Sequence, residues 1–374
     1  MNRRPSQSRT GFDSFSPRHT AHFKAAQPGG EFFEPKPRAS LGRRLLLALL
    51  LMTLIALAVN LAVNQFVRVA RVTVPIRRMD PAFEGYTLLQ ISDLKGATYG
   101  SNQALIRFAL QNEDFDAVVF TGDMVSSRGN AQPLYALIEM LRELKPDAPI
   151  YMIPGDKDPL PASMSYATGG SPFAPWVLGA KQRGGQLLSA PVQIERDGHT
   201  LWLTTSALLS LDMDTMQAQF ERQYLDALAN GDENAIELTT YNLQWLTETR
   251  NARAKMTDAD VYIALTHVPP ADEELESAYP GSLRERVHLV LCGHYQGGLI
   301  RLPFAGALFI PSQNLPLYGL LPGADTYFGL TRKGRTYLYV SPGLGGNDGL
   351  YPLPFFRLFN PPTVSLISLT TSSL

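Results

Sequence analysis

Five short apolar runs in this sequence end abruptly in Gly, Ser or Thr followed by a side chain that can bind a metal. These side chains are three carboxylates and two imidazoles: Asp93, Asp123, Asp156, His267 and His294. Ligands of α/β folds bind outside the carboxyl ends of the strands, so we expect the five residues to meet in one cleft. Two carboxylates about 4 Å apart repel by about 4 kcal/mol at an effective dielectric constant near 20. A compensating cation is therefore required, and a metal ion, Lys95 or Lys157 can supply it.

The runs themselves predict buried strands. They cover residues 86–91, 117–120, 150–153, 261–265 and 287–292. Unbroken apolar runs of this length are typical of strands buried on both faces, so we expect helices on both sides of the sheet. Helical spacing of apolar residues is found in 102–111, 134–144 and 236–250. Residues 187–195 and 200–206 flank a turn-forming Asp-Gly pair and predict a hairpin. The predicted fold is a layered α/β domain with a partly antiparallel sheet.

Residues 44–66 predict a transmembrane signal anchor. The nineteen residues 45–63 carry no charge, and their polar members are Thr53 and Asn60. As a helix they would span about 28 Å, close to the hydrocarbon thickness of a bilayer. A cleaved signal peptide and a buried core helix are the alternatives, and we favour an uncleaved anchor.

The segments on either side of this anchor differ in charge and in predicted structure. Residues 1–44 contain nine Lys or Arg and three acidic residues, with abundant Ser, Pro and Gly. We expect residues 1–43 to be a disordered basic tail. The positive-inside rule places the N-terminus in the cytoplasm and the main domain outside the cell membrane, as a single-pass protein. We expect residues 67–84 to be a linker and residues 85–374 to form the main domain.

The composition excludes several classes of protein and of site. The 374 residues include 33 Lys or Arg and 34 Asp or Glu, so the basic surplus of a nucleic-acid-binding protein is missing. A single cysteine, Cys292, supports neither an internal disulfide nor a Cys-type zinc site. We expect Cys292 to pack as a small apolar side chain. We also expect His199 to be a surface turn residue and His288 to be structural.

The order and spacing of the strand-end residues resemble the calcineurin-like metallophosphoesterase family. The motifs of that family run D-x-H, G-D, G-N-H-D or G-N-H-E, H, and G-H-x-H. The corresponding segments here are Asp93-Leu94-Lys95, Gly122-Asp123, Gly155-Asp156-Lys157-Asp158, Thr266-His267 and Gly293-His294-Tyr295-Gln296. The resemblance covers residues 84–370 and extends to the membrane-anchored bacterial branch of the family. It implies a metallophosphoesterase-type fold, with mixed β-sheets flanked by helices, preceded by one transmembrane helix.

The resemblance implies two metal sites, of which the first is degenerate in this chain. In the family, this site takes the Asp and His of the first motif, the bridging Asp and the last His of G-H-x-H. This chain retains Asp93 and Asp123 but has Lys95 and Gln296 at the two imidazole positions. A charged ammonium group has no lone pair, so Lys95 cannot bind a metal and would repel one.

The second metal site implied by the resemblance is retained. Its ligands would be Asp123, Asp156, His267 and His294, with Asp156 in place of an Asn. Mixed oxygen and imidazole ligands suit one Mn²⁺, Fe²⁺ or Zn²⁺. Lys157 replaces a histidine of the family that assists catalysis. Lysine stabilises an anion but transfers protons poorly near pH 7. Lys157 and the neighbouring Asp158 are the candidate catalytic residues.

Two functional hypotheses follow from these substitutions. In the first, Lys95 replaces the lost metal, while one divalent metal and Lys157 bind a phosphate-containing ligand. Such a site would hydrolyse a phosphoester of an envelope lipid or nucleotide, slowly or with altered chemistry. In the second, the lysines neutralise the carboxylates, no metal binds, and the protein is a pseudoenzyme that recognises a ligand. We favour reduced or lost hydrolase activity with retained phosphate binding. A weaker, third hypothesis is an anchored structural protein that binds a partner through its Gly/Pro-rich loops.

Overall fold

The computed structural model describes residues 40–64, 66–167, 171–276, 283–302, 306–308, 310, 319–323, 327–346 and 357–372. The chain divides into two compact units, residues 1–53 and 54–374. Residues 1–39, most of the tail that we expect to be disordered, lie outside the described residues, as do parts of the Gly/Pro-rich loops. Helix α1 (Leu41–Val63) contains a stretch, Leu41–Ala62, that is long and apolar enough to cross a membrane.

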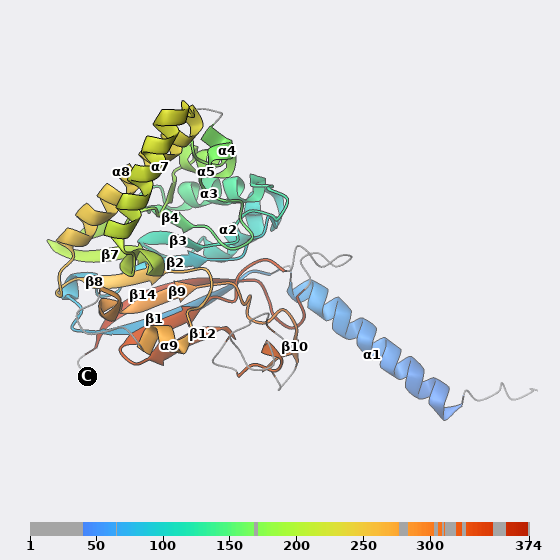
Figure 1. Cartoon of the computed structure of the whole chain (residues 1–374). Helices are drawn as coiled ribbons and strands as arrows, with labels where there is room; N and C mark the ends of the chain where they lie inside the picture. Colours follow the sequence, from blue (N-terminus) through green and yellow to red (C-terminus); the bar gives the residue numbers. More distant parts are fainter. Residues whose placement is uncertain are drawn as a thin grey trace, which may run out of the picture. The chain divides into compact units, whose positions relative to one another are not determined.

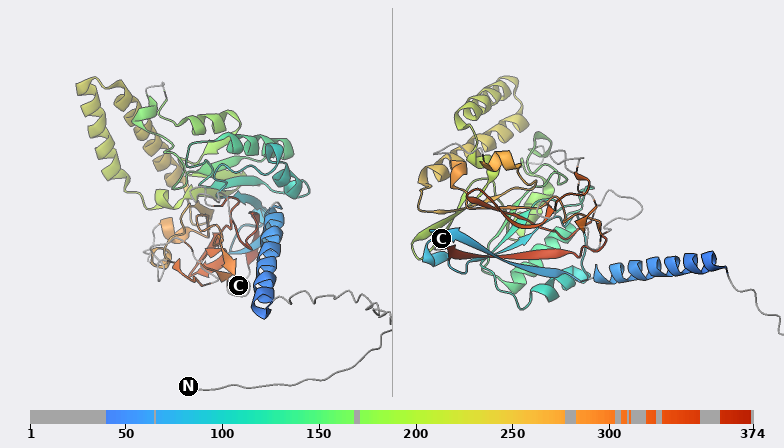
Figure 2. Two further views of the ribbon diagram at one scale, coloured as in Figure 1. Left: turned by 90° about the vertical axis from the view of Figure 1, so that its right-hand side faces the viewer. Right: turned by 90° about the horizontal axis from the view of Figure 1, so that it is seen from below.

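The first of two six-stranded sheets has the order β1-β14-β2-β3-β4-β5. Its strands are β1 (Arg68–Arg77), β2 (Thr87–Ile91), β3 (Ala117–Thr121), β4 (Ile150–Ile153), β5 (Gly185–Leu187) and β14 (Thr363–Ser372). Strands β2 to β5 are parallel, and β14 is antiparallel to β2. Strand β1 pairs in parallel with β14 from Arg68–Thr363 to Arg77–Ser372 (Figure 2). The segment 67–84, expected to be a linker, is thus largely part of this sheet.

The second sheet has the order β12-β13-β9-β8-β7-β6. Its strands are β6 (Val192–Arg196), β7 (His199–Thr205), β8 (Val261–Leu265), β9 (Leu289–Cys292), β12 (Gly329–Lys333) and β13 (Thr336–Val340). The four central strands are parallel, and the two edge strands are antiparallel to their neighbours. The predicted hairpin is formed by β6 and β7, and the residue-187 end of its expected range belongs to β5.

The two sheets pack face to face over an apolar core. Leu88 and Val119 of the first sheet and Leu203, Ile263 and Leu291 of the second belong to this core. Helices α2 (Ala104–Leu110), α3 (Gln132–Leu144) and α5 (Pro175–Gln182) cover the outer face of the first sheet (Figure 1). Strands β2, β3, β4, β8 and β9 are buried on both faces, as expected, but a second sheet covers the face where we expected helices. An apolar strand face has the same sequence pattern under either cover.

A helical hairpin is inserted between β7 and β8 (Figure 1). It consists of α7 (Met213–Asn230) and α8 (Glu233–Lys255). Asp212 and Asp232 cap the N-termini of the two helices, because their carboxylates accept hydrogen bonds from Thr215 N and Ala235 N. The remaining short elements are α4 (Met164–Ala167), α6 (Ser206–Leu209), α9 (Asp272–Glu276), β10 (Arg301–Leu302) and β11 (Gly306–Ala307), with 3₁₀ turns at Pro81–Phe83, Ser101–Gln103 and Leu283–Arg286.

Candidate metal centre

The structure brings the five strand-end residues together, although they come from two different sheets. Asp93, Asp123 and Asp156 follow β2, β3 and β4 of the first sheet. His267 and His294 follow β8 and β9 of the second sheet. The potential ligand atoms of two groups lie within 4.8 Å of one another: Asp156 with His267 and His294, and Asp93 with Asp123 and His267. The edge where the two sheets meet therefore carries one continuous polar centre.

The backbone around this centre adopts conformations that are uncommon for residues with a side chain. Positive φ angles occur at Asp93 (55°), Lys95 (51°), Asp123 (54°), His294 (69°) and Gln296 (50°). Such angles are rare outside glycine, and they persist where surrounding structure enforces them, often at functional sites. Two neighbouring glycines allow the close packing. A Cβ atom on Gly155 would lie 2.2 Å from Asp123 N, and one on Gly293 would lie 1.8 Å from Ser92 Oγ.

Where we expected a degenerate first metal site, Lys95 is buried among oxygen atoms. Its Nζ lies 3.2 Å from Asp123 Oδ2 and 4.0 Å from Asp93 Oδ1. The amide of Gln296, with its oxygen toward Lys95, accepts a hydrogen bond from Nζ and donates one to Gly346 O at 3.3 Å. Lys95 is only 6% exposed. The ammonium group thus supplies positive charge between two buried carboxylates.

Asp93 is held from the opposite side by donors of the chain itself. Its Oδ2 accepts hydrogen bonds from Ser92 Oγ at 2.6 Å and from His294 N at 3.1 Å. The carboxylate is fully buried. The Ser92 hydroxyl therefore takes part in the site, a role that sequence reasoning missed although Ser92 directly precedes Asp93.

His267 belongs to both ligand groups and so joins the two halves of the centre. The first half contains Asp93, Lys95 and Asp123, and the second half contains Asp156, His267 and His294. Its Nδ1 donates to Thr121 O at 2.8 Å, which directs Nε2 toward the carboxylates. Nε2 lies 3.3 Å from Asp123 Oδ2 and 3.0 Å from Asp156 Oδ1. His294 Nδ1 lies 3.4 Å from both His267 Nε2 and Asp156 Oδ1. Two imidazole nitrogens and two carboxylates therefore converge, as a divalent metal site requires.

The charges of these groups depend on one another. Burial lowers the pKa of His267, but its hydrogen bonds to Asp123 and Asp156 outweigh burial and raise the pKa to about 11. The hydrogen bond from His267 holds the pKa of Asp156 well below its usual value. Burial raises the pKa of Asp123, but His267 and Lys95 bring it below its usual value. Burial lowers the pKa of His294. The raised pKa of His267 favours a protonated ring beside the two carboxylates, and a metal bound there would displace this proton.

Lys157 and Asp158, the candidate catalytic residues, have different surroundings. Lys157 N donates to Asp123 Oδ1 at 2.9 Å, and its Nζ, on a side chain 54% exposed, lies 2.8 Å from Asp156 Oδ2. Asp158 instead accepts hydrogen bonds from Val125 N and Gly155 N, one at each oxygen. Burial raises the pKa of Asp158. Lys157 thus lies on the exposed side of the centre, whereas Asp158 braces the loops beneath it.

A fully buried arginine supports the centre and was not foreseen from the sequence. Arg357 is 1% exposed and donates hydrogen bonds to Gln296 O at 3.1 Å and Gly345 O at 2.6 Å. Asn360 also donates to Gln296 O, at 2.7 Å. Gly345 N in turn donates to Asp93 O at 2.6 Å. Burial lowers the pKa of Arg357 to about 10. A charged residue in a Gly/Pro-rich segment normally predicts exposure, so no local pattern indicated this role.

His199, His288 and Cys292 lie outside the centre. His288 Nδ1 accepts a hydrogen bond from Tyr262 N at 3.1 Å. His199 Nδ1 lies 2.8 Å from Asp80 Oδ2. Cys292 is fully buried in β9. His288 and Cys292 thus have hydrogen-bond partners within the fold, and the half-exposed His199 directly follows the Asp197-Gly198 turn.

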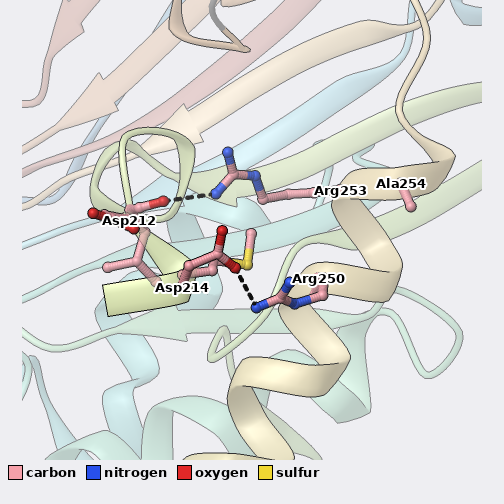
Figure 3. Close-up of a pocket in the computed structure, with 7 residues that line it drawn as sticks. Asp212, Asp214, Arg250, Arg253 and Ala254 are labelled. Carbon is pink, nitrogen blue, oxygen red and sulfur yellow. Dashed lines mark hydrogen bonds and ion pairs between the residues drawn. The ribbon is translucent and has the colours of Figure 1, made fainter. Parts of the chain in front are cut away.

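A separate hollow lies at the base of the α7–α8 hairpin (Figure 3). Its lining residues are Leu211, Asp212, Met213, Asp214, Arg250, Arg253 and Ala254. Arg250 pairs with Asp214 at 3.0 Å, and Arg253 donates to Leu211 O at 3.0 Å. The basic groups of this hollow thus already have partners in the chain, and the strand-end residues do not line it.

A sequence model of the calcineurin-like phosphoesterase family matches residues 86–296, which include the whole centre. The chain belongs to this family. It is 26% identical over 266 residues to the uncharacterized metallophosphoesterase YkuE of Bacillus subtilis, covering 70% of this chain and 73% of that protein. Two crystal structures are also similar. The phosphopantetheinyl hydrolase PptH of Mycobacterium tuberculosis has a TM-score of 0.35 and 13% identity, covering 70% of this chain and 91% of that one. The protein TT1561 of Thermus thermophilus has a TM-score of 0.34 and 10% identity, covering 70% of this chain and 90% of that one.

Proposed function

We propose that this chain is a membrane-anchored phosphoesterase-fold protein that binds a phosphate-containing ligand with one divalent metal and one lysine in place of two metals. The metal, Mn²⁺, Fe²⁺ or Zn²⁺, is held by Asp123, Asp156, His267 and His294. Its hydrolase activity is reduced or lost compared with a two-metal site, because the second ion of the two-metal clamp is replaced.

The position of Lys95 carries this proposal. Its Nζ lies 3.2 Å from Asp123 Oδ2 and cannot itself act as a metal ligand, since an ammonium group has no lone pair. Gln296 reinforces the replacement, because its amide oxygen accepts a hydrogen bond from the same ammonium group. A second metal at this position would need the charge of Lys95 to be removed first.

The other half of the centre supports metal binding. Its carboxylate oxygens and imidazole nitrogens converge, and the hydrogen bond from His267 Nδ1 to Thr121 O leaves Nε2 for the metal. A metal bound there would polarise a phosphate oxygen and lower the pKa of a bound water. Lys157, on the exposed side, would stabilise the anionic ligand electrostatically.

The membrane anchor rests on helix α1, whose stretch Leu41–Ala62 is long and apolar enough to span a bilayer. The basic residues before it favour a cytoplasmic N-terminus and a main domain outside the cell membrane. The basic surplus of a nucleic-acid-binding protein is missing, which favours a phosphate-containing small molecule or lipid as the ligand.

An active single-metal phosphohydrolase is the alternative function. The position of Lys157 favours this alternative. Lys157 lies beside Asp156, where it can interact with a phosphate or with a leaving group. Its substrates would be phosphoesters of an envelope lipid or a nucleotide. Phosphoester hydrolysis by the purified parent chain would favour this alternative over the pseudoenzyme.

Metal stoichiometry tests the proposal. We expect elemental analysis of the purified full chain, offered excess Mn²⁺ and Zn²⁺, to give about one ion per chain, because Lys95 already supplies the positive charge between Asp93 and Asp123. His267→Gln should bring this value close to zero. His199→Gln, which changes an exposed histidine outside the centre, is the matched control and should leave it unchanged. A metal content close to zero in the folded parent would contradict the proposed metal site and favour a metal-free pseudoenzyme.

Restoring the family motif separates a lapsed enzyme from a binding protein. Lys95→His together with Gln296→His would replace the ammonium group and its amide partner by two imidazoles. We expect a second bound ion and a large gain in phosphoester hydrolysis over the parent. A second ion without any gain in hydrolysis would show that the missing metal is not what limits activity.

A further inference from the structure

The C-terminal end of α1 is attached to the folded domain by two asparagines. Asn60 and Asn64 each donate a hydrogen bond to Arg357 O at 2.6 Å, and Phe359 N donates to Asn60 Oδ1 at 2.8 Å. Asn60 is only 2% exposed, and residues 54–64 belong to the same compact unit as the domain. Asn60, which interrupts the apolar run, therefore has hydrogen-bond partners in the domain rather than a lipid environment.

Backbone hydrogen bonds continue from this attachment through three further segments. Leu358 N donates to Leu299 O at 2.8 Å, and Arg301 N donates to Leu358 O at 3.0 Å. Leu308 N donates to Ile300 O at 2.8 Å. Leu321 N donates to Leu308 O at 2.9 Å. The segments around residues 300, 308, 321 and 358 therefore form one surface that is joined to the end of α1.

This surface exposes large apolar side chains. Their exposed fractions are 61% for Leu321, 46% for Leu320, 40% for Phe359, 38% for Leu302 and 36% for Leu308. We call these five residues the apolar rim. Single exposed apolar residues are ordinary on soluble proteins, but a contiguous group of them marks a surface that contacts a partner or a membrane.

We propose that the apolar rim docks on the bilayer that holds α1. Each rim residue lies in a segment linked by hydrogen bonds to the last turns of the helix, so the rim is held near the level at which the helix leaves the membrane. Transfer of leucine and phenylalanine side chains from water to the acyl boundary of a bilayer lowers the free energy. The occupant of the rim is therefore the lipid surface itself.

The segment that carries the rim residue Phe359 also supports the candidate metal centre, through the neighbouring Arg357. Arg357, whose carbonyl oxygen is bound by Asn60 and Asn64, donates to Gln296 O and Gly345 O beneath the centre. The centre would therefore lie close to the membrane surface and would meet phosphate groups carried by lipids there. This inference rests on the membrane anchor of the proposed function, and it adds that the domain rests on the bilayer rather than standing off from it.

Site-specific fluorescence in lipid nanodiscs tests the docking. The full chain is suited to this, because its single cysteine, Cys292, is fully buried and the pKa of its thiol is raised by burial. An environment-sensitive probe is attached to Leu321→Cys, Leu320→Cys, Leu54→Cys or Leu228→Cys in phosphatidylcholine nanodiscs with or without doxyl-labelled lipid. Leu54 lies in α1 and reports insertion of the anchor. Leu228 is 48% exposed in α7, which lies on the opposite side of the domain from β10 (Figure 1), and is the matched control.

We expect probes at Leu320 and Leu321 to lose most of their fluorescence with doxyl lipid, as the probe at Leu54 does, while the probe at Leu228 keeps its intensity. Quenching at Leu54 with none at Leu320 and Leu321 would overturn the docking and leave the anchor standing. An unquenched probe at Leu54 would overturn the anchor itself, and the docking with it.

Discussion

The two halves of the candidate metal centre occupy the same edge of the fold but neutralise their charges in different ways. In the first half, Asp93 and Lys95 are buried, and the cation belongs to the chain. In the second half, the side chain of Asp156 is 37% exposed, and a proton on His267 is the cation. A lysine is covalently fixed, whereas a proton exchanges with a metal. Lys95 thus forms a permanent internal ion pair with Asp123, whereas the charge on His267 can be exchanged.

Removing the fixed cation should have the largest effect. Lys95→Met would leave Asp93 and Asp123 facing each other in a buried environment. We expect the free energy of unfolding of metal-stripped protein to fall by about 3–5 kcal/mol, the usual cost of breaking a buried ion pair on one side. Urea denaturation measures this. Lys145→Met removes the exposed partner of Asp114 and should cost less than about 1 kcal/mol.

Added metal sharpens the same experiment. Without the ammonium group, Asp93 loses its cation and Asp123 keeps only the protonated His267, so we expect Mn²⁺ to restore part of the stability lost in Lys95→Met. Equal stability of Lys95→Met and the parent in the absence of metal would contradict the comparison, because Lys95 would then not be compensating the buried carboxylates.

The exchangeable cation predicts a pH dependence of metal binding. The pKa of His267 is raised to about 11, so the ring is protonated across the neutral range and must lose its proton when a metal binds. The carboxylates are already ionised there, because the pKa values of Asp123 and Asp156 lie below their usual values. We expect the affinity for Mn²⁺ to rise about tenfold per pH unit between about pH 7 and 9, with one proton released per metal.

Calorimetry in buffers of different ionisation enthalpy measures that proton directly. His294 should add nothing to the count above pH 7, since burial lowers its pKa. Metal binding without proton release at pH 7 would mean that His267 is neutral, and the two halves would then not differ in the way described. The Lys95→Met variant should release the same proton, because His267 keeps both carboxylate partners.

Local sequence patterns predicted the strands of the centre well. The apolar runs around β2, β3, β4, β8 and β9 are unbroken, and each ends at a residue whose chemistry differs sharply from the run. The family resemblance and the fold are confirmed by the match over residues 86–296. The sequence also has a lysine, Lys95, where the family has a metal ligand, and the structure places its ammonium group 3.2 Å from Asp123 Oδ2.

Long-range pairing was harder to predict. Strand β1 pairs with β14, which lies at the other end of the domain's sequence, and nothing local in β1 specifies that partner. Local patterns alone did not show that two sheets pack together, because burial patterns do not identify what covers a face; the family resemblance implied the mixed sheets. Arg357 was missed because its acceptors are backbone carbonyl groups of separate loops. Every residue has such a carbonyl group, so the residue types do not identify the acceptors.

We expect the smallest effect from a substitution of Lys157, on the exposed side of the second half. Lys157 Nζ is held near Asp156, but its side chain is 54% exposed, so water and salt screen its interaction with a bound anion. We expect Lys157→Gln to weaken the binding of inorganic phosphate to the metal-loaded protein by roughly two- to fivefold at about 0.1 M salt, corresponding to about 0.4–1 kcal/mol. Titration calorimetry measures it, with Lys333→Gln, another surface lysine paired with an aspartate, as the control. The effect should shrink at about 0.5 M salt. A loss of about a hundredfold that persists in salt would mean that Lys157 becomes buried around the ligand, and the second half would then resemble the first.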